Sequence, residues 1–284
     1  MSEPTLPPAP RGPVTGETEL VEMVQQELES IIPFTARINR AWMQLGGMLF
    51  MFVRACVRAV TPPLALGSIG YQVVMLGVRS LSIATLVALF AGLVLSLQFA
   101  YFLAKFGVQH TVGKVVILTL FRELGPVLTA LTVGARIGSG ITAELGSMKV
   151  TEQIDAISAL GADPIKKLVT PRLVACGIVL PALTALADVV GLIAGSVVVN
   201  QQYDIPFDQY FRSAIDTVSL MDFWGGIFKS FVFGLIIAIV GCFKGFSVTG
   251  GTEGVGQATT ETVAIASVAV CLSDFFMTKL FMAF

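Results

Sequence analysis

The sequence predicts an all-α protein that crosses a membrane several times. Of its 284 residues, 55% are hydrophobic and only 13% are charged, and the mean hydropathy is +0.82. Ordinary soluble domains carry about 25% charged residues. Apolar segments long enough to cross a hydrocarbon core of about 30 Å alternate with short polar connections. We therefore expect about five transmembrane helices, preceded by amino-terminal interfacial (elbow) helices.

The first part of the chain is expected to stay outside the hydrocarbon core. Residues 1–16 contain five prolines and no apolar core of a cleavable signal, which predicts a disordered cytoplasmic tail. Residues 17–79 predict a polar helix followed by interfacial helices. The segment Trp42–Val60 carries Arg54 and Arg58 among its apolar residues, which favours an elbow helix in the headgroup region over a span.

Residues 80–284 are expected to form the transmembrane domain. The expected spans are Leu81–Ala104, Val115–Ile137, Leu173–Val199, Phe223–Phe243 and Val263–Phe284. The glycine-rich stretch Gly245–Val263 predicts a loop before the last span. It contains no G-x-x-x-x-G-K-[ST] motif and therefore does not predict a phosphate-binding loop.

Lysines and arginines predict the orientation. Most of those outside the spans fall on one side of this arrangement, namely Arg54, Arg58, Arg79, Lys149, Lys166, Lys167, Arg172 and Lys244. The positive-inside rule makes that side cytoplasmic. Five spans with the amino terminus in the cytoplasm place the carboxyl terminus on the outer side of the membrane, which is the periplasmic side if the membrane is a bacterial inner membrane.

Several ionisable residues lie inside the expected spans, and five of them are candidates for a functional role. They are Arg122, Glu123, Asp188, Lys229 and Asp274. Each costs about 2.5–3.5 kcal/mol on insertion scales, so such groups face protein or water and not lipid. They either form static pairs that fix helix packing or line a polar part of a transport path. The second role is favoured, although the sequence assigns no pairing among them.

A polar segment between the second and third spans predicts a surface helix. Val150, Ile154, Ile157 and Leu160 recur at roughly helical spacing, and Gly161 ends the pattern. We expect one amphipathic helix over about residues 143–161. Periodicity alone leaves two roles open, a simple connector and a docking element.

Four sequence words in this region resemble the central signature of the MlaE/YrbE family. They are RELGPV, GARIGS, TAELGSMKVTEQIDA and DPIKKLVTPR, within residues 122–172. This family comprises the permease subunits of lipid-transporting ABC systems that are associated with MCE proteins. The similarity continues from about Leu64 to the carboxyl terminus.

The resemblance implies a non-catalytic permease subunit in the bacterial inner membrane. Such a subunit handles phospholipid, either maintaining outer-membrane lipid asymmetry or moving lipid across the cell envelope with a periplasmic MCE-domain protein. A homodimer is expected. The chain itself needs no cofactor, because a separate ABC ATPase binds ATP and Mg.

The resemblance also implies roles for particular residues. The surface helix would couple to the ATPase through Glu144, Lys149, Glu152, Ile154, Asp155 and Ile157. Lipid would lie near the first and last spans, with candidate contacts at Leu93, Leu97, Tyr101, Phe275, Phe276 and Leu280.

Other classes of function are less well supported by the residues. The single histidine, His110, excludes a histidine-rich metal site, and no catalytic motif such as G-x-S-x-G is present. A net charge of −1 gives no reason to expect nucleic acid. Two alternatives remain. One is a self-contained ion-coupled transporter or channel, and the other is a membrane scaffold that transports nothing.

Overall fold

The computed structural model describes residues 42–61 and 66–282. The expected tail and the expected polar helix before Trp42 lie outside these residues. The chain divides into two units, Met1–Leu49 and Phe50–Phe284. Only helical residues 42–49 of the first unit are described, so the fold below is that of the second unit.

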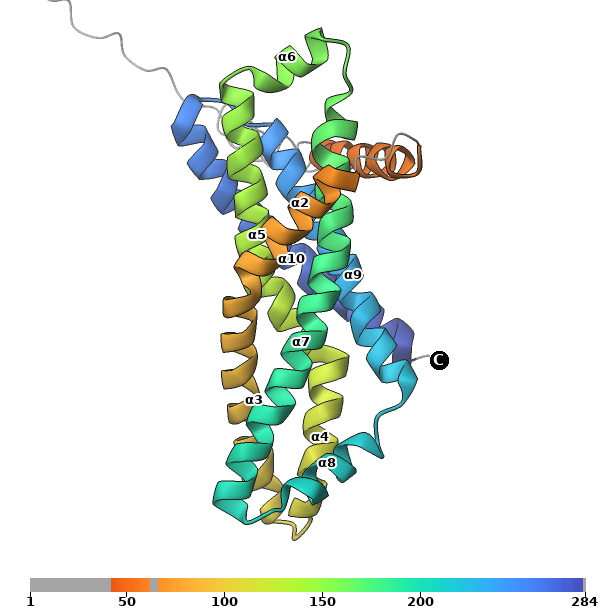
Figure 1. Cartoon of the computed structure of the whole chain (residues 1–284), viewed down its shortest axis with the longest axis vertical. Coiled ribbons are helices and arrows are strands. Elements are labelled where there is room, and N and C mark those ends of the chain that lie inside the picture. The colour runs from red at the N-terminus through yellow and green to blue at the C-terminus, as the bar shows by residue number, and fades with distance from the viewer. Residues whose placement is uncertain (1–41, 62–65, 283–284) are drawn as a thin grey trace, which may run out of the picture. The chain divides into compact units, whose positions relative to one another are not determined.

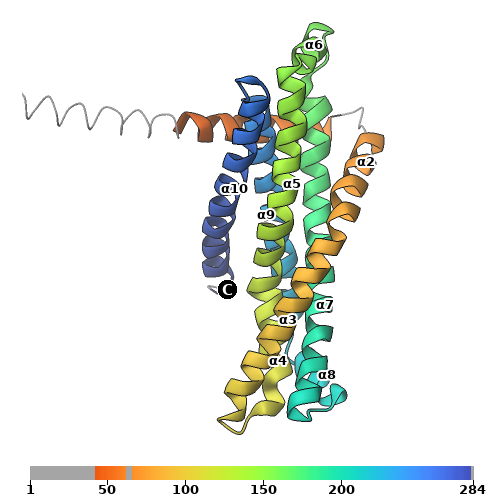
Figure 2. The ribbon, with the colours of Figure 1, turned by 90° about the vertical axis from the view of Figure 1, so that its left-hand side faces the viewer.

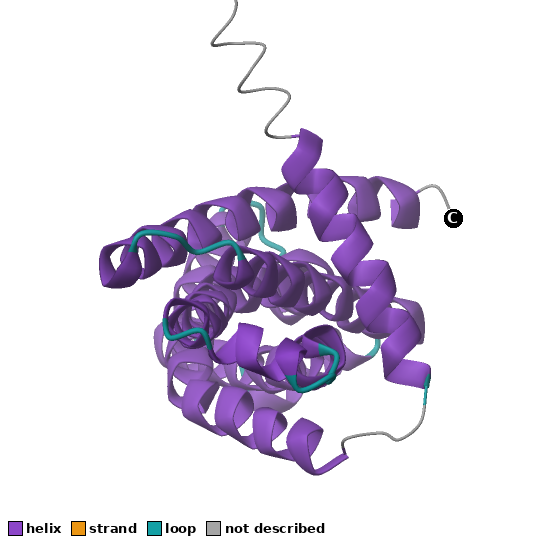
Figure 3. Cartoon of the chain, turned by 90° about the horizontal axis from the view of Figure 1, so that it is seen from above, coloured by secondary structure: helices purple, strands orange, loops and turns teal. Residues whose placement is uncertain are grey.

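Every regular element in the described part of the chain is helical, which confirms the all-α prediction (Figure 3). The long helices run side by side as a bundle (Figures 1 and 2). The helices are α2 (Leu66–Gly77), α3 (Leu81–Ala104), α4 (Val112–Thr119), α5 (Gly125–Val150), α6 (Gln153–Ala159), α7 (Thr170–Tyr203), α8 (Phe207–Ile215), α9 (Leu220–Phe246) and α10 (Gly251–Met282).

Within residues 42–61 and 66–282, six helices are long and apolar enough to cross a membrane. The additional one is Trp42–Val60, which the sequence places in the interface. Its part within the second unit, residues 50–60, runs crosswise to the long helices rather than along them (Figures 1 and 2). Arg54 and Arg58 lie 3.4 and 3.1 Å from the Asp163 carboxylate. The arginines that set this helix apart from the other spans therefore bind the connection between α6 and α7.

The helices extend beyond the expected spans. The π-helical turn Leu120–Leu124 joins α4 to α5, so the helical path runs from Val112 to Val150. The prediction of a loop over Gly245–Val263 is wrong from Gly251 onward, because α10 begins there. The buried Thr262 hydroxyl lies 2.8 Å from that of Thr142 on α5. Such packing outweighs the weak helix propensity of glycine.

Helix α5 lies at the centre of the bundle and packs against α7, α9 and α10. Small residues allow the helices to approach closely elsewhere in the bundle. A Cβ on Gly92 of α3 would overlap the backbone of Gly191 of α7. Helices α7 and α9 are the most buried of the candidate spans, whereas α10 has much exposed surface.

Helices α6 and α8 lie at opposite ends of the bundle (Figures 1 and 2). Tyr210 anchors α8, because its side chain is buried and its hydroxyl lies 3.3 Å from Ser96 of α3. Burial raises the pKa of the Tyr210 phenol to about 12, although the hydrogen bond with Ser96 opposes the shift. The phenol therefore stays neutral at physiological pH.

Candidate functional site

The π-helical turn before α5 exposes a backbone acceptor within the bundle. In the turn, the N–H of Gly125 donates to the carbonyl five residues earlier. Pro126 has no N–H, so it cannot donate to the carbonyl of Arg122 four residues earlier. Lys229 of α9 donates to that carbonyl instead, at 2.9 Å. The sequence R-E-L-G-P thus leaves the Arg122 carbonyl free to accept a hydrogen bond from a cation on another helix.

Lys229 also binds acidic and hydroxyl partners on two helical segments. Its ammonium donates to Glu123 Oε2 at 2.9 Å and to Thr278 Oγ1 at 2.7 Å. These bonds and the bond to the Arg122 carbonyl use all three ammonium protons. Asp274 Oδ1 lies 3.0 Å from the same nitrogen and has no hydrogen-bond donor among the described residues. Asp274 is therefore held by charge alone.

The group formed by Glu123, Lys229, Asp274 and Thr278 is called the Lys229 cluster below. The Thr278 hydroxyl accepts from Lys229 and donates to Glu123, at 3.1 Å from Oε1. Two carboxyl groups share one ammonium, whose side chain is only 3% exposed. The cluster therefore keeps acceptor capacity that its own donors do not fill.

A cavity of about 300 Å³ opens beside the Lys229 cluster. Arg122 lines it and pairs with Asp222 at 2.6 Å. Asp222 also accepts from the Ser219 backbone N–H and hydroxyl, which caps the start of α9. Met221 and Phe281 give the cavity an apolar wall. The site can hold a group that is polar at one end and apolar at the other.

Three of the five predicted intramembrane charges, Arg122, Glu123 and Lys229, line this cavity, and Asp274 pairs with Lys229. Asp188 lies apart from them. Asp188 lies on α7, is 2% exposed, and has one carboxylate oxygen against Gly125. That oxygen has no hydrogen-bond partner within the described residues. Asp188 contacts Gly125, directly after the π-helical turn, and does not join the Lys229 cluster.

The sequence did not identify Thr278 as part of the site. It follows Asp274 by four residues, so the two share one face of α10. This four-residue spacing was the feature of the sequence that could have identified Thr278. The pairing of Arg122 with Asp222 has no such signal, because the two residues are far apart in the chain.

The prediction of one surface helix over residues 143–161 is wrong. Helix α5 continues to Val150, and a turn at Thr151 and Glu152 separates it from the seven-residue α6. Glu152 adopts a left-handed conformation with φ of 58°. This conformation costs a non-glycine residue about 1–2 kcal/mol. Helical periodicity alone cannot reveal a single residue with positive φ. The apolar pattern therefore continued through the turn and predicted one helix in place of two.

Some of the predicted coupling residues are paired or packed within the chain, and others have side chains that a partner can reach. Glu144 pairs with buried Arg172 at 2.8 Å, and Lys149 pairs with Asp155 at 2.9 Å. Ile154 is 4% exposed and packs within the chain, so it is not available to anchor a partner. Ile157 is half-buried and Glu152 is exposed.

Leu160 offers the apolar surface that was expected of Ile154. It follows α6 directly and is 86% exposed. It was part of the periodic pattern, but it was not named among the coupling residues.

The six predicted lipid contacts lie on two separate faces. Leu97, Tyr101, Phe275, Phe276 and Leu280 are exposed, and Leu93 is half-buried. Helix α3 packs mainly against α7, whereas α10 packs against α5 and α9. One copy of the chain therefore does not join these residues into a single surface.

Comparison with known proteins agrees with this architecture. The family model described as Permease MlaE matches residues 69–280. A probable ABC transporter permease of Synechocystis sp. is 44% identical over 74% of this chain and 80% of its own length. A probable ABC transporter permease of Rickettsia typhi is 39% identical over 82% of this chain and 89% of its own.

A plant protein is also similar. The chloroplastic protein trigalactosyldiacylglycerol 1 of Arabidopsis thaliana is 37% identical over 72% of this chain and 59% of its own length. The family match covers most of the residues that form the bundle, the Lys229 cluster and the α5–α6 turn. The chain therefore belongs to the MlaE permease family and is the permease subunit of an ABC transporter.

Proposed function

We propose that this chain is the membrane-spanning subunit of a homodimeric ABC transporter for phospholipid in a bacterial inner membrane. It would exchange lipid with a periplasmic MCE-domain protein, while a separate ATPase binds ATP and Mg and supplies the energy. Membership of the MlaE family supports the permease role. The name of the plant relative, trigalactosyldiacylglycerol 1, supports a lipid as cargo.

The Lys229 cluster and its cavity are the observation that carries this proposal. A phospholipid has a charged, hydrogen-bonding headgroup and apolar chains. Glu123 lines the cavity with a side chain that is 39% exposed, and its carboxylate can accept from a headgroup ammonium or hydroxyl. The Arg122 side chain is 56% exposed and can bind phosphate, because its guanidinium suits that geometry.

The size of the cavity suggests how the lipid is held. A volume of about 300 Å³ is at the small end of the range for ligand pockets. It suits a headgroup, with the acyl chains outside on apolar surface. The exposed side chains of α3 and α10 supply such surface, and a second copy of the chain would bring one α3 toward another α10.

The α5–α6 turn is proposed as the surface that meets the ATPase. It lies at the end of the bundle opposite α8 (Figure 1), the end expected to face the cytoplasm. Glu152 and Leu160 are exposed there. Helix α5 connects this turn directly to the π-helical turn that holds Glu123. Movement at the ATPase could therefore reach the Lys229 cluster along one helix.

Purification of the tagged full chain from native membranes tests the proposal. Mass spectrometry of the isolated complex should identify an ABC ATPase, an MCE-domain protein and phospholipid. Gly225 lines the cavity, and a Cβ there meets nothing within 4 Å. Gly225→Leu should therefore fill the cavity without disturbing helix packing. This variant should retain the ATPase but lose most of the bound phospholipid.

Gly256→Leu is the matched control. Gly256 lies on α10 outside the cavity, and a Cβ there also meets nothing within 4 Å. Leucine favours a helix over glycine by about 1 kcal/mol, so neither change should unfold the chain. Equal phospholipid in Gly225→Leu, Gly256→Leu and the unaltered chain would contradict the assignment of this cavity.

A further inference from the structure

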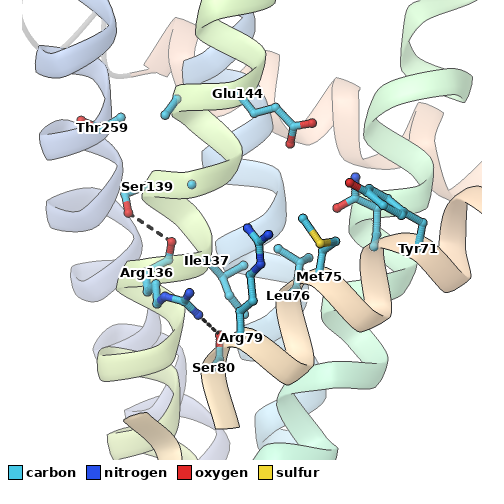
Figure 4. A pocket seen from close by; sticks show the side chains of 13 residues that line it. Tyr71, Met75, Leu76, Arg79, Ser80, Arg136, Ile137, Ser139, Glu144 and Thr259 are labelled. Carbon is cyan, nitrogen blue, oxygen red and sulfur yellow. Dashed lines mark hydrogen bonds between the residues drawn. The ribbon is translucent and has the colours of Figure 1, made fainter. Parts of the chain in front are cut away.

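A second and larger cavity lies between α2, α5 and α10. Its volume is about 610 Å³, compared with about 300 Å³ beside the Lys229 cluster. Met75, Leu76 and Ile137 give it an apolar wall (Figure 4). Arg79 and Arg136 extend from two different helical segments into the same region (Figure 4). The cavity thus combines two guanidinium groups with apolar surface.

Neither arginine has an acidic partner within the described residues. Arg136 donates to the hydroxyl of Ser80, which is fully buried, at 2.8 Å. No ion pair joins Arg79 or Arg136 to a carboxylate in residues 42–61 or 66–282, whereas Arg54, Arg58, Arg122 and Arg172 all form one. The guanidinium groups therefore keep N–H donors that are free to bind an anion.

One carboxylate, that of Glu144, also lines the cavity. It would repel an anion if its charge were unbalanced. Arg172 lies 2.8 Å from it, and the Arg172 side chain is only 5% exposed. The Glu144 charge is therefore already compensated, which leaves the positive charge of Arg79 and Arg136 in excess.

The position of the two arginines along the bundle indicates the nature of the anion. Arg79 comes just before α3, whose 24 residues carry no charge and span about 36 Å. Arg79 therefore lies where a hydrocarbon core ends. Arg136 binds Ser80 and so lies at the same level. Phosphate groups of phospholipids occupy this level of a membrane.

We propose that Arg79 and Arg136 bind the phosphate of a phospholipid headgroup in this cavity. The apolar wall then receives the first part of the acyl chains. Arg136 follows Glu123 by 13 positions, or about 20 Å along the helix. This inference rests on the proposed function and adds a second lipid-binding position to it, nearer to α6 than the Lys229 cluster.

Native mass spectrometry of the full chain, without ATPase, tests this site. Gly225→Leu is used as the background, so that the first cavity contributes no lipid. The probes are phosphatidylglycerol and a diacylglycerol with identical acyl chains. Arg79→Gln together with Arg136→Gln should weaken phosphatidylglycerol binding at least about tenfold, because charge-assisted hydrogen bonds are lost. Diacylglycerol binding should not change.

Two further variants separate the phosphate site from general effects. Gly140 lines the cavity, and a Cβ there meets nothing within 4 Å. Gly140→Leu should therefore reduce phosphatidylglycerol binding while both arginines remain. Arg212→Gln removes an exposed cation on α8 and should have no effect. Equal phosphatidylglycerol binding in Arg79→Gln/Arg136→Gln, Gly140→Leu and Arg212→Gln would overturn the proposal.

Inorganic phosphate distinguishes a lipid headgroup from a free anion. Millimolar phosphate should displace little phosphatidylglycerol, because it lacks acyl chains for the apolar wall. Complete displacement would make free phosphate the ligand and overturn the assignment to lipid. This binding is measured without ATPase, so the two proposals can be tested separately. If the arginine cavity binds no phosphatidylglycerol, ATP-driven lipid transport should still be observed. If the chain does not transport lipid, phosphatidylglycerol binding in this cavity should still be observed.

Discussion

Lys229 donates its three ammonium protons to the Arg122 carbonyl, Glu123 and Thr278. Lys229→Met removes that cation and leaves the half-buried Glu123 and Asp274 carboxyl groups without their shared partner. Breaking a buried ion pair on one side typically costs about 3–5 kcal/mol. We expect lower membrane abundance and a lower midpoint of denaturant unfolding in detergent.

A variant that removes all three charges separates stability from function. In Lys229→Met/Glu123→Gln/Asp274→Asn no uncompensated charge remains, so most of the lost unfolding free energy should return. Lipid transport should stay absent, because the polar end of the cavity is gone. A triple variant that transports normally would show that the Lys229 cluster serves packing alone.

At the residue scale, intramembrane charge identified three residues that the structure brings into contact. Hydropathy identified Glu123, Lys229 and Asp274 because each interrupts an otherwise apolar segment. Asp188 satisfies the same criterion but contacts Gly125 of α5 and lies outside the Lys229 cluster. Sequence position cannot distinguish these cases, because the direction of a side chain depends on how helices far apart in the chain are rotated against each other.

At the scale of elements, the break between α5 and α6 depends on the backbone of Glu152. Glu152→Gly accepts a φ of 58° without a steric penalty. It should raise the free energy of unfolding by about 1 kcal/mol. Glu152→Pro fixes φ near −65° and should reorient α6, so that the ATPase no longer co-purifies from the membrane.

The apolar anchor on this turn can be tested separately. Leu160→Asp places a charge on the exposed residue after α6. It should reduce ATPase co-purification at least about tenfold, since it removes an anchor from a desolvated interface. Ile157→Asp, at a half-buried position, serves as the comparison. Equal retention of the ATPase by Leu160→Asp and the unaltered chain would assign the turn a connecting role only.

The exposed faces of α3 and α10 predict a pattern of lipid labelling. Cysteine at Leu97 or Phe276 should crosslink to a photoactivatable phospholipid more than cysteine at Phe228 of α9. Phe276 and Phe228 have similar exposure, 61% and 52%, so exposure alone predicts similar labelling of these two. Equal labelling at all three positions would indicate contact with bulk lipid only.

Across the whole molecule, the apolar segments predicted the long helices but not their ends. Hydropathy identifies the apolar residues of a helix, whereas the positions of helix ends depend on tertiary packing and capping residues. Helix α9 begins at Leu220 because Ser219 and Asp222 form a capping box. Helix α10 begins at Gly251, twelve residues before its expected span. The helix Trp42–Val60 raises the number of candidate spans from five to six.

The most direct test of the account is lipid transfer in proteoliposomes that contain the full chain with its ATPase. Transfer of a fluorescent phospholipid should require ATP and should occur with the unaltered chain and with Gly256→Leu. It should be lost in Lys229→Met/Glu123→Gln/Asp274→Asn, although this variant still binds the ATPase. Transfer driven by an ion gradient without ATP, or undiminished transfer by the triple variant, would contradict the account.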